Sequence, residues 1–240
     1  MNFKTITMFK TSKLSLLFVI AIFTGFLSAC KDDEKEPVKE GIQRSELIFT
    51  ELHGDGLEAH GDHFHGLGDA VEGESFTVEF DAQGNAISGG HLHLEADGIY
   101  KLELKAWDHT NKEVQNDYIA SKAVADNYKA FLIGGNFKLN ADTEGGAIFQ
   151  PRELKYGDGT DVNGKYETTG ITSYFIAGDS NTGPTVEVSY ILRKLDAGVK
   201  AKIERTDWND SNYKTKFPGT DGFDLRFELH IEEEGHHHDH

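Results

Sequence analysis

Apolar and polar residues alternate with a period of two along several short stretches of the chain. The clearest stretches are residues 185–192 and 222–231, where every second side chain is apolar. Residues 46–52 and 75–80 show similar alternation, and segments rich in Gly, Asn and Asp lie between the stretches. Because successive side chains of a strand point to opposite faces, this pattern predicts β-strands with one buried face and one solvated face.

Turn signals indicate how these strands follow one another. Residues 81–85, Asp-Ala-Gln-Gly-Asn, are typical of a turn, and we expect a return strand over residues 86–94. A second turn at residues 97–98 leads into a strand over residues 99–107. With four prolines and 26 glycines, the chain suits many short strands joined by tight turns.

Two segments depart from this pattern. Residues 113–129 carry apolar side chains closer to helical spacing and predict one short helix, which leads into a strand over residues 130–133. Residues 157–165 are rich in Gly, Asp and Asn and predict a loop. Together these features predict an all-β domain over residues 42–231, an antiparallel β-sandwich (immunoglobulin-like or related) with one short helical connection.

The N-terminus has the features of a targeting signal. Three lysines surround the start of a mostly apolar run, residues 14–26, which is short for a bilayer span but suits a signal peptide. The run is followed by Leu-Ser-Ala-Cys30, which resembles the lipobox of bacterial lipoproteins. We therefore expect residues 1–29 to be a lipoprotein signal peptide and Cys30, the only cysteine, to be lipidated. The alternative is an ordinary secretory signal that ends in cysteine.

Residues 30–41 are charged and contain proline, so they predict an acidic, solvated tether after the lipidated Cys30. The Cys-Lys-Asp-Asp sequence at its start resembles the surface-export signal of lipoproteins in the Bacteroidota, and the alternative is a plain spacer. The resemblance implies a protein that is lipid-anchored in the outer membrane and faces the cell exterior.

The balance of charge bears on possible partners. The chain carries 41 acidic and 24 basic residues, a formal net charge of −17. Nucleic-acid-binding proteins carry a basic surface, so nucleic acid is not an expected partner. A strongly negative surface instead concentrates cations near the protein.

Histidine supplies the clearest candidate chemistry, because most of the twelve histidines fall in two clusters. The first cluster comprises His53, His60, His63, His65, His91 and His93. The second is the acidic tail over residues 232–240, with His236, His237, His238 and His240. We interpret the tail as a secondary metal-collecting segment, and a purification tag is the alternative.

The first histidines of the first cluster lie in a stretch that becomes rich in glycine after residue 53. Glycine lets the backbone fold back on itself, so these histidines are free to converge. Three carboxylates lie among them: Asp55, Glu58 and Asp62. Imidazole nitrogen and carboxylate oxygen are both suitable ligands for zinc.

His91 and His93 lie two residues apart in a predicted strand, so both point to the same face. Leucines occupy the alternate positions and are expected to face the core. Gly89 and Gly90 before the pair allow close approach of a loop. We therefore expect a metal site in which this histidine pair faces the loop over residues 60–65, with the number of sites left open.

The ligand types favour zinc among the divalent metals. Copper(I) prefers soft sulfur ligands, of which the chain has few, and calcium prefers sites made of oxygen alone. Nickel and copper(II) remain open, and merely solvated surface histidines are the alternative. Because histidine binds a metal only when unprotonated, we expect the affinity to fall between about pH 7 and pH 5.

A family resemblance covers residues 44–231 and rests on strand patterns and turn residues. The segments that carry it are similar to segments of small Bacteroidota lipoproteins: residues 76–85, 89–90, 98–104, 156–164 and 222–231. Genes for such lipoproteins tend to lie beside genes for TonB-dependent outer-membrane receptors. The resemblance implies a β-sandwich that assists such a receptor, and it supplies no ligand residues.

The chain contains no His-Glu-x-x-His or Gly-x-Ser-x-Gly motif, so we do not expect an enzyme. The leading hypothesis is an accessory protein in zinc acquisition. The first alternative is a haem-binding lipoprotein, with Tyr100, Phe131 and Phe175 around a histidine-ligated ring. The second is an adhesin or glycan-binding module that uses exposed aromatic residues: Trp107, Trp208 and Tyr213.

Overall fold

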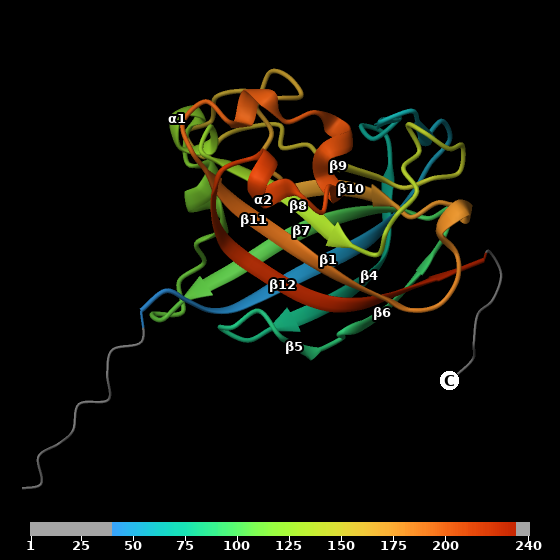
Figure 1. Cartoon of the computed structure of the whole chain (residues 1–240), viewed down its shortest axis with the longest axis horizontal. Coiled ribbons are helices and arrows are strands. Elements are labelled where there is room, and N and C mark those ends of the chain that lie inside the picture. The colour runs from blue at the N-terminus through green and yellow to red at the C-terminus, as the bar shows by residue number, and fades with distance from the viewer. Residues whose placement is uncertain (1–39, 234–240) are drawn as a thin grey trace, which may run out of the picture. The chain divides into compact units, whose positions relative to one another are not determined.

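The structure, a computed structural model, describes residues 40–233 (Figure 1). Its larger sheet has six strands in the order β5-β4-β1-β7-β10-β9, and each neighbouring pair is antiparallel. These strands are β1 (Ile42–His53), β4 (Val71–Phe80), β5 (Ala86–Ser88), β7 (Ile99–Asp108), β9 (Ile148–Pro151) and β10 (Thr172–Ile176).

The second sheet has four strands in the order β6-β12-β11-β8, and β2 and β3 form a separate hairpin. β12 pairs antiparallel with β11 and parallel with β6. The strands outside the larger sheet are β2 (Glu58–His60), β3 (His63–His65), β6 (His91–Glu95), β8 (Tyr128–Gly134), β11 (Val186–Leu195) and β12 (Gly219–Glu232). The all-β sandwich that the alternating pattern predicts is confirmed, with one parallel pair among its described strands.

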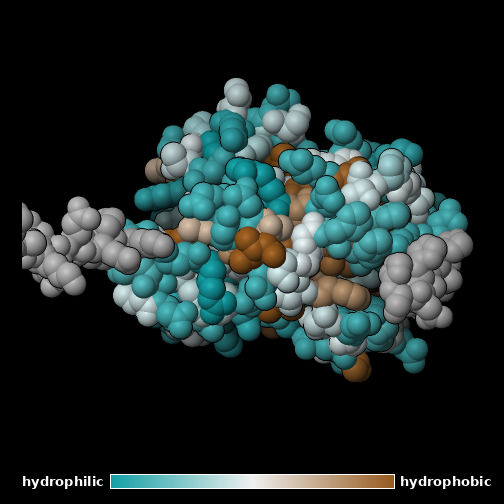
Figure 2. Space-filling view, turned by 90° about the horizontal axis from the view of Figure 1, so that it is seen from below, coloured by the Kyte–Doolittle hydropathy of each residue, from teal (hydrophilic) through white to brown (hydrophobic). Residues whose placement is uncertain are grey.

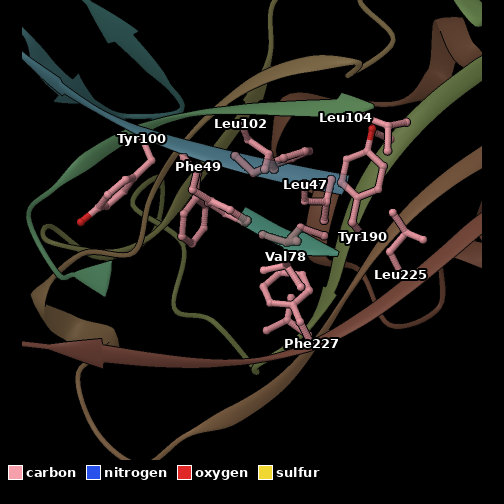
Figure 3. Packing of buried hydrophobic residues seen from close by; sticks show 14 of the residues in the cluster. Leu47, Phe49, Val78, Tyr100, Leu102, Leu104, Tyr190, Leu225 and Phe227 are labelled. Atoms are coloured by element: carbon pink, nitrogen blue, oxygen red, sulfur yellow. The ribbon is translucent and has the colours of Figure 1, made fainter. Parts of the chain in front are cut away.

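The core lies between the two sheets, where apolar side chains from both meet (Figure 3). Leu47 and Leu102 of the six-stranded sheet and Tyr190 of the four-stranded sheet are fully buried. The rings of Phe49 and Phe227 meet between the sheets, with centroids 5.8 Å apart and an edge-on arrangement. Full burial of one large apolar side chain contributes about 1.5–3 kcal/mol, which is why every second position of these strands is apolar.

The single return strand predicted over residues 86–94 is wrong, because the chain forms β5 in one sheet and then β6 in the other. Gly89 lies at this crossing with a φ of 63°, and a Cβ there would stand 2.2 Å from the carbonyl oxygen of Thr77. Glycine alone satisfies both conditions. The N–H of Glu228 on β12 then donates to the carbonyl of Gly90 at 2.7 Å, where β6 begins to pair. The backbone at Gly89 and Gly90 is therefore approached closely by β4 and β12, and not by a loop as predicted.

Short helical turns fill several connections. The helix predicted over residues 113–129 is a 3-10 turn, η1 (Gln115–Ile119), followed by a one-turn helix, α1 (Lys122–Ala125). The side chain of Ser121 caps α1 by accepting the N–H of Val124. Further turns were not predicted, because such short elements show no hydrophobic period: η2 (Asp179–Asn181), η3 (Lys200–Lys202), η4 (Arg205–Asn209) and α2 (Tyr213–Lys216).

Several predicted features lie outside the described residues. They are the signal peptide over residues 1–29, Cys30, nearly all of the tether over residues 30–41, and the tail histidines from His236 to His240. Within residues 40–233, no helix combines the length and the apolar character needed to cross a membrane.

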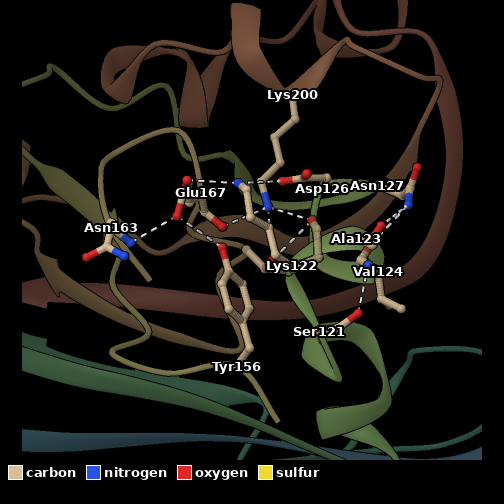
Figure 4. Close-up of polar contacts among 12 residues, drawn as sticks. Ser121, Lys122, Ala123, Val124, Asp126, Asn127, Tyr156, Asn163, Glu167 and Lys200 are labelled. Carbon is tan, nitrogen blue, oxygen red and sulfur yellow. Dashed lines mark hydrogen bonds and ion pairs between the residues drawn. The ribbon is translucent and has the colours of Figure 1, made fainter. Parts of the chain in front are cut away.

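Two lysines are buried, Lys200 at the start of η3 and Lys129 on β8. The Nζ of Lys200 donates to the carbonyl oxygens of Ala125 and Glu167 and to Oγ1 of Thr169, at 2.6, 3.1 and 3.1 Å (Figure 4). Burial lowers the pKa of Lys200 to about 7, and the charge of Lys129 acts in the same direction. Burial also lowers the pKa of Lys129, on β8, to about 8.

We expect the free energy of unfolding to rise between pH 7.5 and pH 9.5. A lysine of the unfolded chain has a pKa near 10.4, so in this window the unfolded state binds more protons than the folded state. Stability then rises with pH, by roughly 2–4 kcal/mol for the two lysines together. Urea unfolding at both pH values measures the rise. In Lys200→Met the rise should fall by about half, and an undiminished rise would contradict the role of Lys200.

Candidate metal centres

The segment that carries three of the predicted ligands is a hairpin rather than a glycine-hinged loop. Its two-residue turn has Gly61 in first position with a φ of 56°, a conformation that glycine adopts readily. His60 pairs with His63 across the hairpin. Opposite residues of an antiparallel pair share a face, as do residues two apart on one strand. His60, His63 and His65 therefore lie on one face, and Phe64 lies on the other.

We call His60, His63 and His65 the hairpin triad. Each offers one ring nitrogen, and these nitrogens lie within 4.8 Å of one another. Ring centroids are 4.7 Å apart for His63 and His65 and 5.8 Å apart for His60 and His65. On the opposite face Phe64 is buried, and its N–H donates to Oε1 of Gln150 on β9 at 3.0 Å. These contacts hold the hairpin on the domain and orient the triad outward.

Asp62 supports the hairpin triad from within its turn. The Nδ1 of His63 donates to Oδ1 of Asp62 at 2.9 Å, and Nη1 of Arg205 donates to the same oxygen at 3.1 Å. Partial burial acts to raise the pKa of Asp62, but the hydrogen bonds from His63 and Arg205 outweigh it and hold the pKa below its usual value. With Nδ1 engaged, Nε2 of His63 is left to bind a metal, an arrangement that metal-binding histidines commonly use. Asp62 thus orients a ligand.

A second group of three histidines lies on the outer face of the four-stranded sheet. In the parallel register of β6 and β12, His93 lies beside His230 and His91 lies beside Glu228. Aligned residues share a face, so His91, His93 and His230 all point outward. As predicted, Leu92 and the leucine that follows His93 are buried on the core side. We call His91, His93 and His230 the sheet triad.

The sheet triad has a similarly close grouping of ring nitrogens and more carboxylate partners. Its three ring nitrogens also lie within 4.8 Å of one another. The Nδ1 of His91 donates to Oε2 of Glu228 at 3.0 Å, and the Nδ1 of His93 donates to Oε1 of Glu232 at 2.5 Å. Both carboxylates come from β12, on either side of His230. They orient two imidazoles and add negative charge that favours a bound cation.

Some of the predicted ligands join neither triad. His53, at the end of β1, is exposed, with its Nε2 3.4 Å from a carboxylate oxygen of Glu51. Asp55 is exposed before β2, and Glu58 lies opposite His65 in the hairpin. None of these side chains belongs to either histidine group of the described chain.

The predicted joining of His91 and His93 with the loop over residues 60–65 is wrong, because the structure divides these histidines between two triads. His230, which completes the sheet triad, was not among the predicted ligands. A signal was present, since the alternation over residues 222–231 places His230 on the polar face of its strand. The alternation does not indicate that β12 pairs with β6, which is what brings His230 beside His93.

Each triad can coordinate a transition-metal ion. Nitrogen ligands of tetrahedral zinc lie about 2.0–2.1 Å from the metal, hence roughly 3.3 Å from one another. The ring nitrogens of each triad lie within 4.8 Å of one another, and their mainly exposed side chains have the rotational freedom to reach the spacing that zinc requires. Three imidazoles leave a fourth position for water or another ligand, the coordination of an accessible site rather than a closed structural one.

Glu228→Gln is expected to weaken zinc binding at the sheet triad by about 10–100-fold, because the loss of a carboxylate that orients a ligand has that effect in metal sites. Affinity at the hairpin triad should stay unchanged. Glu187→Gln is the matched control, since Glu187 is exposed on β11 directly opposite Glu228. Calorimetric titration measures both, and equal affinities of the two variants would contradict the role of Glu228.

The aromatic residues invoked for the alternative functions lie in the interior. Trp107, Trp208 and Tyr213 are buried, so their predicted exposure is wrong. The face shown in Figure 2 is mostly hydrophilic, with small separate apolar areas. The residues suggested to surround haem are core residues too: Tyr100, Phe131 and Phe175. None of these three aromatic side chains is exposed beside a histidine triad.

The fold and the two triads define an all-β protein with two candidate centres for a transition-metal ion. Comparison with protein-family models, with curated proteins and with solved structures gives no match. The resemblance to Bacteroidota lipoproteins therefore stays a prediction from the sequence.

Proposed function

We propose that this protein is a surface-exposed lipoprotein that binds zinc reversibly at its two histidine triads. The observation that carries the proposal is the repeated arrangement of three imidazoles within 4.8 Å of one another, once on a hairpin and once on a sheet. In both, at least one Nδ1 is hydrogen-bonded to a carboxylate, which leaves Nε2 to the metal.

The histidine ligands favour zinc, and the exposure of their side chains favours transfer of the bound zinc to another protein. Nitrogen ligands without sulfur suit zinc, nickel and copper(II), and zinc accepts three histidines with an open fourth position. Four of the six triad histidines are exposed, and the other two are half-buried. A metal held there is reachable by a second protein, so we assign a binding and handover role rather than catalysis.

The cellular setting of the proposal rests on the sequence. A lipidated Cys30 would hold the domain at the outer membrane, and the acidic residues after it favour the cell exterior. The resemblance to lipoproteins encoded beside TonB-dependent receptors makes such a receptor the proposed recipient of zinc. Labelling with radioactive palmitate tests the anchor, because Cys30→Ala should abolish the label.

Zinc calorimetry tests the central claim. The variant used for calorimetry starts at Lys31 and carries alanine in place of the tail histidines. Only zinc binding by the domain is then measured. We expect two zinc ions per chain with Kd values below about 10 μM. Haem is titrated in parallel. A chain that binds haem and no zinc would replace the proposal with the haem alternative, and one that binds neither would leave the adhesin alternative.

A further inference from the structure

A cavity of about 440 Å³ opens beside the hairpin, away from the sheet triad. Its walls come from β3, β8 and β9, the segment of residues 152–168, and η4. This volume lies within the range of pockets that bind small molecules. Neither triad accounts for it, although His63 contributes to its rim.

Four basic residues line this cavity in a chain that is strongly acidic overall: Lys129, Arg152, Lys165 and Arg205. Two of them have a carboxylate partner. Lys165 pairs with Glu204 at 2.8 Å, and Arg205 pairs with Asp62 at 3.1 Å. For Lys129 and Arg152, the described part of the chain provides no carboxylate within ion-pair distance.

Lys129 is the more unusual of the two unpaired cations, because it is buried. Its Nζ donates to the carbonyl oxygen and to Oγ1 of Thr168, at 2.9 and 3.0 Å. Glu153 is near, but its carboxylate accepts the N–H groups of Thr169 and Gly170 instead. Burial lowers the pKa of Lys129 to about 8, with Glu153 acting to raise it and Arg205 to lower it. A buried cation without an ion-pair partner is unfavourable. The cavity lining has four basic residues against two acidic ones, Glu153 and Glu204, so an anion in the cavity would be attracted.

The rest of the lining is suited to the apolar part of an organic ligand. Its accessible apolar surface comes from Leu154, which is 73 % exposed, and from the half-buried Pro151 and Val162. The other large apolar lining residues are buried side chains of the domain: Phe64, Phe131, Ile203 and Trp208. Apolar walls with a few convergent polar groups are the usual composition of a small-molecule site. A bare inorganic anion would leave Leu154 and Val162 in contact with water.

We propose that this cavity binds a small organic anion, whose carboxylate or phosphate group is recognised by Lys129 and Arg152 and whose apolar part packs against Leu154 and Val162. Arg152 supplies a planar donor that matches either group, and Lys129 supplies a fixed ammonium at the wall. This ligand site goes beyond metal binding and is independent of it.

The test uses protein that has been stripped of metal with a chelator and then dialysed free of the chelator, so failure of the zinc proposal does not affect it. The probes are benzoate, octanoate and phenyl phosphate. Benzamide is the uncharged analogue of benzoate, and inorganic phosphate is an anion that lacks an apolar group. We expect the organic anions to bind by ligand-observed NMR and calorimetry, and benzamide and inorganic phosphate to bind at least about tenfold more weakly.

Arg152→Ala and Lys129→Met should each weaken the organic anions at least tenfold. Lys155→Ala is the matched control, because Lys155 lies in the same segment, is exposed and pairs with Asp161 outside the cavity lining. Should Lys129→Met unfold, the half-buried Arg152 still provides the test. The proposal is overturned if no organic anion binds below about 5 mM, if benzamide matches benzoate, if inorganic phosphate matches phenyl phosphate, or if Arg152→Ala binds like Lys155→Ala.

Discussion

Replacing His63 and His65 by alanine is expected to reduce the zinc bound per chain from two ions to one. The change removes two of the three imidazoles of the hairpin triad, and a single remaining histidine holds zinc weakly. Loss of one orienting partner already costs 10–100-fold, so loss of two ligands should cost more than about 100-fold at that site. The second ion should bind as in the parent, since the sheet triad shares no residue with the hairpin triad.

The reciprocal variant replaces His91 and His93 by alanine and should remove the other ion. Both measurements use calorimetry on the chain whose tail histidines are already alanine. His53→Ala and His109→Ala are matched controls, because both histidines are exposed and belong to neither triad. If either double variant abolished all zinc binding, the two triads would act as one site. If neither changed the stoichiometry, zinc would bind elsewhere.

Phe64→Ala is expected to cost about 3–5 kcal/mol in the free energy of unfolding, the usual range for a buried phenylalanine. Phe64 is 2 % exposed and packs in an apolar cluster with Leu52, Ile148 and Ile176. It lies between His63 and His65 and anchors the hairpin that carries them. We therefore also expect zinc affinity at the hairpin triad to fall at least about tenfold, while the sheet triad keeps its affinity.

Leu92→Ala is the matched control for the loss of zinc affinity that we expect in Phe64→Ala. Leu92 is also buried and lies between two ligands, His91 and His93, so its loss should cost a similar 2–5 kcal/mol. Its metal effect should appear at the sheet triad alone. Urea unfolding and calorimetry measure the two quantities. A loss of stability with unchanged affinity at the neighbouring triad would show that the buried residue does not position its histidines.

Local features of the two triads follow directly from the sequence. His91 and His93 share a face because they are two residues apart on a strand, and the burial of Leu92 confirms the orientation. The convergence of His60 with His63 was also expected, although a hairpin rather than a loop produces it. In both cases the relevant neighbours are close in the chain, so periodicity and glycine content are sufficient to predict them.

Other features depend on contacts between distant segments. The pattern over residues 86–94 predicts one strand, and the crossing at Gly89 becomes necessary only because the carbonyl of Thr77 lies against it. In the same way, Lys129 carries no special signal in the sequence. Its burial and its lack of an ion pair depend on contacts with residues far along the chain, such as Thr168.

By itself, then, the sequence determined the all-β sandwich, the outward direction of His91 and His93, and the proximity of His60 to its hairpin partners. Each of these depends on side-chain alternation or on turns within a few residues. Only the tertiary structure decided that there are two triads and that His230 completes the second. That outcome rests on the parallel pairing of β6 with β12, which joins segments about 137 residues apart. Strand pairing at such a distance is set by how the whole core packs, and no local pattern of residues records it.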